Sequence, residues 1–197
     1  KNGGSTDFSY PQPGWKLGTV GMGPQGPDTI RNALTFTTPP LDKDLEVVGP
    51  IVLKLYVSST TDDTDFFVKL SDQHPQDADA RGRNLQPAFQ VVSKGWLRAS
   101  HREKDEKRST RYRPFYTHAN PQPIEPGRVY KYEIEVMPCA HLFRAGHRIR
   151  LEILNGDSPV TDAIFTHQYL YYKVGTDTYW HNEKYPSRLL LPVVPSK

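Results

Sequence analysis

The sequence has a single cysteine, Cys139, among its 197 residues, and this scarcity excludes an intrachain disulfide framework. It also has no apolar run near the roughly twenty residues that a membrane-spanning helix needs. Neither charge sign dominates, because 25 Lys and Arg stand against 22 Asp and Glu, so no nucleic-acid or membrane partner is indicated. A lone thiol fits a reducing compartment such as the cytoplasm, but the localisation stays open.

The Gly-x-Ser-x-Gly nucleophile elbow of α/β-hydrolases is also missing. The nearest segment is 156–160, where a valine replaces the final glycine. Ser158, Asp177 and His181 do follow one another in the order of a hydrolase triad, but these residue types are common enough for that order to arise by chance. We therefore predict no catalytic residue in this chain and interpret Ser158 as a serine in a turn.

Metal-binding patterns are absent as well. The segment 77–88 begins like an EF-hand loop, yet Arg81 and Ala88 stand where its fifth and twelfth ligand positions fall. The nearby acidic residues are Asp62, Asp63, Asp65, Asp72, Asp77 and Asp79. No two of the seven histidines have His-x-x-x-His spacing; they are His74, His101, His118, His141, His147, His167 and His181. We predict no metal and no cofactor, with Ca²⁺ in the acidic loop left open, and we expect His141 and His147 to cap strands or bond to backbone.

What the sequence does contain is alternation of apolar and polar residues, together with 18 prolines and an aromatic share of 11%. The clearest alternating segments are Ile51–Ser58, Asp65–Asp72, Val129–Val136 and His147–Leu154. Shorter candidates are Leu34–Thr37, Leu45–Val48, Phe89–Val92, Trp96–Arg98, Thr176–His181 and Leu189–Val194. About eight to ten strands at this spacing predict an all-β fold, a jelly-roll or Greek-key β-sandwich.

The connections carry further expectations. We expect a turn or bulge at Lys94–Gly95, and a long turn or a crossover between sheets at Pro138–Gly146. Val160–Tyr171 fits either a helical stripe or a strand and stays unassigned. Residues 1–33 are rich in Gly and Pro and predict a lead-in or interdomain linker, which leaves 34–197 as the sandwich domain. We expect the chain to be an excised domain or a processed piece of a longer protein.

Six motifs in sequence carry a resemblance to a known family. They are IVLKLYVSS after Gly49-Pro50, DTDFFVKLSD (63–72), GWLRASHR (95–102), IEPGRVYKYEIEV (124–136), HLFRAGHRIRLEI (141–153) and PSRLLLPV (186–193). Their order over Leu34 to Pro195 resembles the C-terminal jelly-roll domain, galactose-binding-domain-like, of the X-prolyl dipeptidyl peptidase and cocaine esterase family of serine hydrolases.

The resemblance implies a non-catalytic accessory domain of an X-Pro dipeptidyl-peptidase or acyl esterase. In that family the catalytic triad belongs to a separate α/β-hydrolase domain, which the jelly roll packs on while it helps to wall the acyl pocket. The expected partner is therefore that hydrolase domain of the same parent protein, with this chain alone inactive. The substrate of the parent enzyme, an ester, an amide or an X-Pro peptide, stays open.

Two other functions remain from the residues themselves. Trp15, Trp96 and Trp180 could serve as sugar platforms, which makes a carbohydrate-binding module the alternative function. The second of these functions is a contact between copies of the chain in a homo-oligomer.

The segment Arg102–Arg113 holds six basic and three acidic residues, and this mixture predicts an exposed loop with interleaved ion pairs rather than a nucleic-acid patch.

Overall fold

The computed structural model describes residues 4–10, 34–76, 88–155 and 175–195, which form β-strands and one short 3-10 turn, η1 (Ala99–His101), with no α-helix among them. The strands are β1 (Ser5–Tyr10), β2 (Leu34–Thr37), β3 (Leu45–Ser59), β4 (Asp65–Gln73), β5 (Phe89–Arg98), β6 (Tyr130–Phe143), β7 (Arg148–Leu154), β8 (Gly175–Trp180) and β9 (Arg188–Leu190). The predicted all-β class is confirmed. Within these described ranges no helix is long and apolar enough to cross a membrane.

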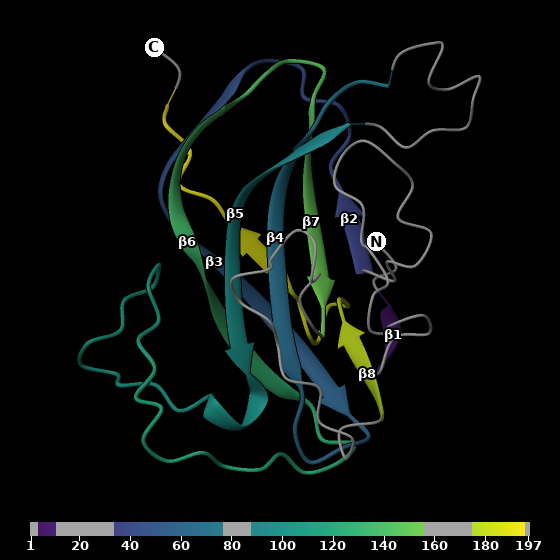
Figure 1. Ribbon diagram of the computed structural model, residues 1–197, viewed down its shortest axis with the longest axis vertical. Coiled ribbons are helices and arrows are strands. Elements are labelled where there is room, and N and C mark those ends of the chain that lie inside the picture. Colours follow the sequence, from purple (N-terminus) through teal and green to yellow (C-terminus); the bar gives the residue numbers. More distant parts are fainter. Residues whose placement is uncertain (1–3, 11–33, 77–87, 156–174, 196–197) are drawn as a thin grey trace, which may run out of the picture.

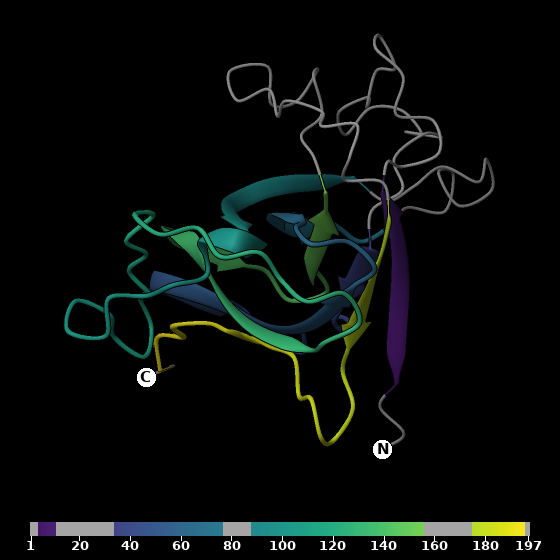
Figure 2. The ribbon, with the colours of Figure 1, turned by 90° about the horizontal axis from the view of Figure 1, so that it is seen from below.

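The strands form one continuous antiparallel sheet in the order β1-β8-β3-β6-β5-β4-β7-β2, with β9 beside β3. The sheet curls on itself, so that the half containing β8, β3 and β6 faces the half containing β5, β4 and β7 (Figures 1 and 2). Most connections between consecutive strands pass from one half to the other, as in a jelly-roll β-sandwich.

Aromatic and aliphatic side chains from both halves meet in the core. Phe66 of β4 packs against Tyr132 of β6, with ring centroids 4.7 Å apart, and meets Tyr179 of β8 edge-on at 6.2 Å. The other large, fully buried apolar side chains are Val47, Ile51, Val52, Leu53, Val57, Leu70, Ile134, Phe143 and Ile153. Burying one such side chain stabilises the fold by about 1.5–3 kcal/mol, so contacts across the sandwich are its main source of stability.

One glycine sits where the two halves join. Gly95 of β5 pairs in register with Val136 of β6, and this pair links the halves into one sheet. A Cβ atom on Gly95 would overlap the carbonyl oxygen of Glu135 and stand only 3.0 Å from the Cα atom of Val136. The backbones can approach this closely only because residue 95 has no side chain.

Two strands are longer than the sequence predicts. Leu45–Val48 and Ile51–Ser58 are one strand, β3, because Gly49 adopts a φ of 126° and the register shifts between Gly49 and Ile51. Pro138 lies at the same irregularity on β6, which then continues to Phe143. The predicted connection over Pro138–Gly146 is therefore mostly strand, although the short turn that remains does cross between the halves, as one of our alternatives held.

The alternation along β4 separates two faces, and its face with Phe66, Val68 and Leu70 lies in the core. The opposite face of β4 is buried as well, including Lys69 and Ser71. Glu152 of β7, which the alternation there predicts to point out, is buried opposite Lys69 in register. Its carboxylate forms an ion pair with Arg150 at 3.1 Å, which offsets the cost of burying its charge.

Two further differences concern β5 and the amino-terminal segment. The bulge expected at Lys94–Gly95 lies instead at Val92, since Leu70 pairs with Ser93 and Ser71 pairs with Val91. In the predicted lead-in 1–33, the stretch Ser5–Tyr10 forms β1 and pairs with β8 along its length. An edge strand of the sheet therefore comes from a segment that composition alone marked as a linker.

The charged loop after η1 lies over the outer face of β6. Its Lys104 reaches Glu133 at 2.6 Å, and Lys54 and Lys131 contact the same carboxylate at 2.9 and 2.8 Å. Burial raises the pKa of Glu133, but the hydrogen bonds from the three lysines outweigh it and hold that pKa at about 2, below the ordinary 4.5. The loop forms one ion pair of its own, Lys104 with Glu106 at 3.6 Å, and its other ion pairs join it to Glu133 and Glu135 of β6.

Replacing Gly95 tests the joint between the two halves. We expect Gly95→Ala to lower the free energy of unfolding by about 3 kcal/mol or more, because overpacking in a core costs 1–3 kcal/mol and here the overlap is with backbone. Urea unfolding followed by tryptophan fluorescence measures the change. Gly4→Ala is the matched control, since its Cβ would meet only the His181 ring at 3.7 Å. Equal stability of the two variants would contradict the role given to Gly95.

Glu133 makes the stability depend on pH in a defined direction. Its pKa is lowered in the folded state, so its stabilisation is present above pH 4.5 and is lost as the pH falls towards 2. We expect Glu133→Gln to lower the free energy of unfolding at pH 7 by about 1–2 kcal/mol. The gap from the unmodified chain should close between pH 4.5 and 2 in urea titrations. Glu125→Gln, which loses only the exposed pair with Arg128, should show no such pH dependence; a constant gap for Glu133→Gln would refute the assignment.

Candidate functional site

A buried carboxylate lies between two imidazoles at one end of the sandwich. Asp72, near the end of β4, is only 4% exposed. Its Oδ2 is 2.9 Å from Nε2 of His141 on β6, and its Oδ1 is 2.8 Å from Nδ1 of His147, which directly precedes β7. Because β4 and β6 belong to opposite halves, this carboxylate also ties the two halves together. We expected strand caps or backbone partners for both histidines, and the side chain of Asp72 is their partner instead.

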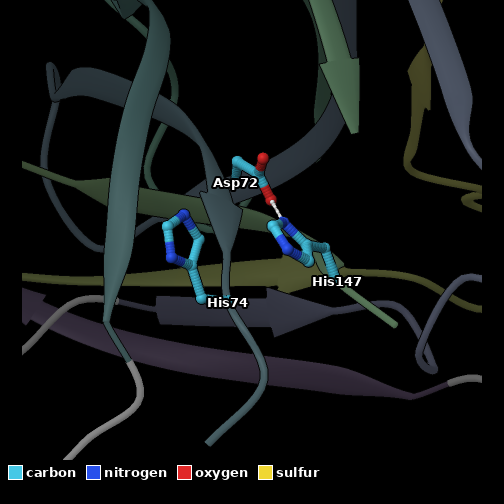
Figure 3. Close-up of side chains that lie close together, drawn as sticks. All are labelled: Asp72, His74 and His147. Carbon is cyan, nitrogen blue, oxygen red and sulfur yellow. Dashed lines mark hydrogen bonds and ion pairs between the residues drawn. The ribbon is translucent and has the colours of Figure 1, made fainter. Parts of the chain in front are cut away.

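A third imidazole joins the group. The ring of His74 stacks on that of His147 with centroids 4.8 Å apart and planes inclined by 34°. Figure 3 shows Asp72 and His147 joined by their hydrogen bond, with His74 near them at the end of β4. One potential ligand atom each from Asp72, His74 and His147 lies within 4.8 Å of the other two. The group can therefore accept a proton, hold a hydrogen-bond network, or bind a metal ion.

The strand register explains why these residues meet. β4 and β7 are antiparallel, with Gln73 paired to Arg148, so the residues just beyond, His74 and His147, face each other. Backbone hydrogen bonds fix both positions: the amide of His74 donates to the carbonyl of Ala88, and the amide of His147 donates to that of Arg144. Asp72, His74, His141 and His147 come from three separate segments, so their spacing in the sequence does not indicate that they meet. Only knowledge of the strand order would have predicted it.

Two members of the rejected hydrolase triad, Asp177 and His181, bind other partners in the fold. Asp177 is buried on β8, where its Oδ2 accepts hydrogen bonds from Thr64 Oγ1 at 2.6 Å and Asn155 Nδ2 at 2.9 Å. Burial raises the pKa of Asp177, and its hydrogen bonds from Thr64 and neighbouring side chains counteract the rise. His181 accepts a hydrogen bond at Nδ1 from the amide of Gly4. Ser158 lies outside the described residues, and the prediction of no catalytic residue stays a prediction.

Two of the other acidic residues, Asp63 and Asp65, serve as hydrogen-bond acceptors. Asp63 binds the amide and hydroxyl of Ser100 through its two carboxylate oxygens, and Asp65 pairs with Arg98 at 2.8 Å. Asp77 and Asp79, and with them the EF-hand-like loop, lie outside the described residues. Asp63 and Asp65 therefore bind neighbouring segments of the fold. Whether Ca²⁺ binds the acidic loop, which the sequence left open, is untested.

The tryptophans do not share one surface role. Trp180 donates its indole N–H to Ser58 at 3.1 Å and packs beside Tyr185, with centroids 5.8 Å apart. Trp96 on β5 is partly exposed, and Trp15 lies outside the described residues. A sugar platform needs an exposed ring with free polar neighbours, and the hydrogen bond of Trp180 commits its polar edge to the protein.

An apolar cavity of about 310 Å³ lies between β2 and β7 on one side and β3, β8 and β9 on the other. Its walls are Phe36, Leu53, Leu55, Leu151, Ile153, Tyr179, Trp180, His181, Ser187, Arg188 and Leu189. Among these walls, polar side-chain groups come from His181, Ser187, Arg188, the hydroxyl of Tyr179 and the indole N–H of Trp180. Ser187 is already engaged, because its hydroxyl donates to the carbonyl of Trp180 and accepts from the amide of Tyr56.

Comparison with known proteins agrees with this fold. Over 130 residues the chain is 35% identical to a protein named as a serine esterase in Mycobacterium tuberculosis, covering 64% of this chain and 19% of that protein. It is 27% identical to the cocaine esterase of a Rhodococcus species over 170 residues, covering 83% and 26%. A crystal structure of a CocE/NonD family hydrolase from Staphylococcus aureus superimposes with a TM-score of 0.66 at 27% identity, covering 82% and 30%.

The chain thus spans between about a fifth and a third of the relatives that it matches. Residues 25–190 match the family described as the X-Pro dipeptidyl-peptidase C-terminal non-catalytic domain. That match covers most of the chain and includes β2 to β9. Fold, motif order and family match agree, and the chain belongs to the family of X-Pro dipeptidyl-peptidase C-terminal non-catalytic domains.

Proposed function

We propose that this chain packs on a separate α/β-hydrolase domain of the same parent protein and helps to wall the acyl pocket of that domain. The proposal rests on how little of a related hydrolase this chain accounts for. The chain aligns over 82% of its own length with the Staphylococcus aureus hydrolase but accounts for only 30% of that chain. The parent reaction would then be hydrolysis of an ester or of an X-Pro peptide by residues outside this chain.

One face of the sandwich suits such packing. The outer face of β3 and β6 has two parts: around Glu133 and Glu135 it carries ion pairs with the charged loop, among them Arg113 with Glu135 at 3.1 Å. Beyond the irregularity at Pro138 the same face is mostly apolar, with Glu46 as its charged member. We call this part the bare face; it consists of Val48, Met137, Ala140 and Leu142, all of them exposed.

The apolar side chains of the bare face are exposed to solvent. Met137 is 56% exposed and Leu142 is 37% exposed, and the register places Val48 opposite Ala140 and Leu142 opposite Glu46. Contiguous exposed apolar side chains mark interaction sites more often than isolated ones do. A domain of the same polypeptide is the partner that the coverage indicates, since it is always present at high effective concentration.

Charged substitutions on the bare face test the packing. We expect the double variant Met137→Asp, Leu142→Asp to lower the thermal unfolding midpoint of the full-length parent by several degrees. A loss of about 2 kcal/mol corresponds to roughly 4–8 °C for a domain of this size. In the isolated chain the same variant should unfold at an unchanged midpoint, because both side chains are already in solvent there.

Tyr112→Asp is the matched control, since Tyr112 is also exposed but lies in the charged loop. It should change neither midpoint, and turnover of the parent should fall only for the bare-face variant. Equal loss of stability in the isolated chain and in the parent would show that the two residues act in folding. No loss in either would place the interface elsewhere and overturn the assignment of the bare face.

A further inference from the structure

The carboxylate of Asp72 is buried with a charge that needs compensation. A buried carboxylate is stable only when a positive charge or several hydrogen-bond donors face it. Its two hydrogen-bond partners, His141 and His147, are imidazoles, and an imidazole in its neutral form supplies a single N–H donor. A metal ion would supply positive charge directly, and a third imidazole, that of His74, lies beside His147.

We propose that Asp72, His74 and His147 bind one divalent transition-metal ion, with Zn²⁺ as the best fit. Two imidazole nitrogens and one carboxylate oxygen are ligands that Zn²⁺ accepts readily, whereas Ca²⁺ and Mg²⁺ require oxygen ligands throughout. Three protein ligands leave a fourth position to water. His74 is exposed, so the ion can reach this position from solvent.

The separations fit a site that closes around the ion. Zn–N and Zn–O bonds of about 2.0–2.2 Å place neighbouring ligand atoms about 3.3 Å apart in a tetrahedral site. The candidate atoms of the three residues lie within 4.8 Å of one another, and the His74 side chain is exposed, so its ring can rotate towards the other two ligands. Nδ1 of His147 and Oδ1 of Asp72 can both bind the ion once the hydrogen of the neutral ring is on Nε2, so their mutual hydrogen bond is exchanged for two bonds to the ion.

His141 acts on the site through Asp72. Its Nε2 lies 2.9 Å from Oδ2, the carboxylate oxygen that His147 does not contact, and its ring stands edge-on to Phe143 at 4.7 Å. This contact orients the carboxylate, so that Oδ1 faces His147. We therefore assign His141 as a positioning residue rather than a ligand.

A second pair of histidines provides an internal control. His101 and His118 lie on the surface with their Nδ1 atoms 3.2 Å apart, and their rings are 5.3 Å apart. Among the described residues, the Asp72 group alone brings three ligating side chains together, so the pair lacks a third ligand. Two surface imidazoles bind transition metals weakly, and removing them leaves the Asp72 group unchanged.

The experiment uses the whole chain without an affinity tag, stripped of metal by a chelator. Calorimetric titration with Zn²⁺ should show one ion per chain, and the absorption of Co²⁺ should gain the intense visible bands of a tetrahedral site. We expect His74→Ala and His147→Ala each to weaken Zn²⁺ binding at least tenfold, and His141→Ala to weaken it by about 10–100-fold. The double variant His101→Ala, His118→Ala should bind as the unmodified chain does.

His74→Ala is the decisive variant, because an exposed side chain can be removed without loss of the fold. Added Zn²⁺ should raise the thermal unfolding midpoint of the unmodified chain and of the surface-pair variant, but not that of His74→Ala. Absence of stoichiometric binding in the unmodified chain would overturn the proposal. So would unchanged affinity in His74→Ala together with loss of binding in the surface-pair variant. Neither result bears on the packing against a hydrolase domain, which is tested on other residues.

Discussion

The close approach of β5 and β6 at Gly95 is the constraint on which the rest of the structure depends. One register pair, Gly95 with Val136, joins the two halves of the sheet, and the curl at this joint brings their inner faces together. The contact of Phe66 with Tyr132 and the contact of Asp72 with His141 both span the halves. A side chain at position 95 would separate β5 from β6, and every contact across the sandwich would have to adjust.

Two polar clusters lie at the two ends of β4. Between them the inward side chains Phe66, Val68 and Leu70 are apolar, whereas Lys69 and Ser71 are buried on the other face of the strand. At the strand's start, Thr64 and Asn155 bind the buried Asp177, and Asp65 pairs with Arg98. At its end, Asp72 holds the histidines. The first group is closed, because its members bind one another, whereas the second has an exposed member, His74. This difference is why the first group serves the fold and the second is the candidate for a ligand. Neither brings a serine and a histidine together, in keeping with a domain of a non-catalytic family.

The strands could be predicted where one face is buried and the other is not. The inward set of β6 followed from alternation, as did the family from motif order; that set is Tyr130, Tyr132, Ile134 and Val136. Alternation also separated the two faces of β4, but it could not show that the second face of β4 and Glu152 of β7 are buried, because a strand buried on both faces has no exposed side to predict. The predicted lengths of β3 and β6 were too short, because Pro50 and Pro138 usually indicate the end of a strand. Here both prolines lie at one β-bulge, and the two strands continue beyond it. The Asp72 group could not be predicted, since its members are neighbours only through the strand order.

The most direct test of the central claim, that this chain is a non-catalytic domain, is hydrolysis by the chain alone. Turnover of p-nitrophenyl acetate and of an X-Pro-nitroanilide would be followed with and without a serine-directed phosphonate, and the chain would then be analysed for a phosphonate label. A domain whose partner carries the chemistry gives no turnover and no labelled serine. Turnover that the phosphonate abolishes, with the label on Ser158, would contradict the claim and would make this chain an enzyme.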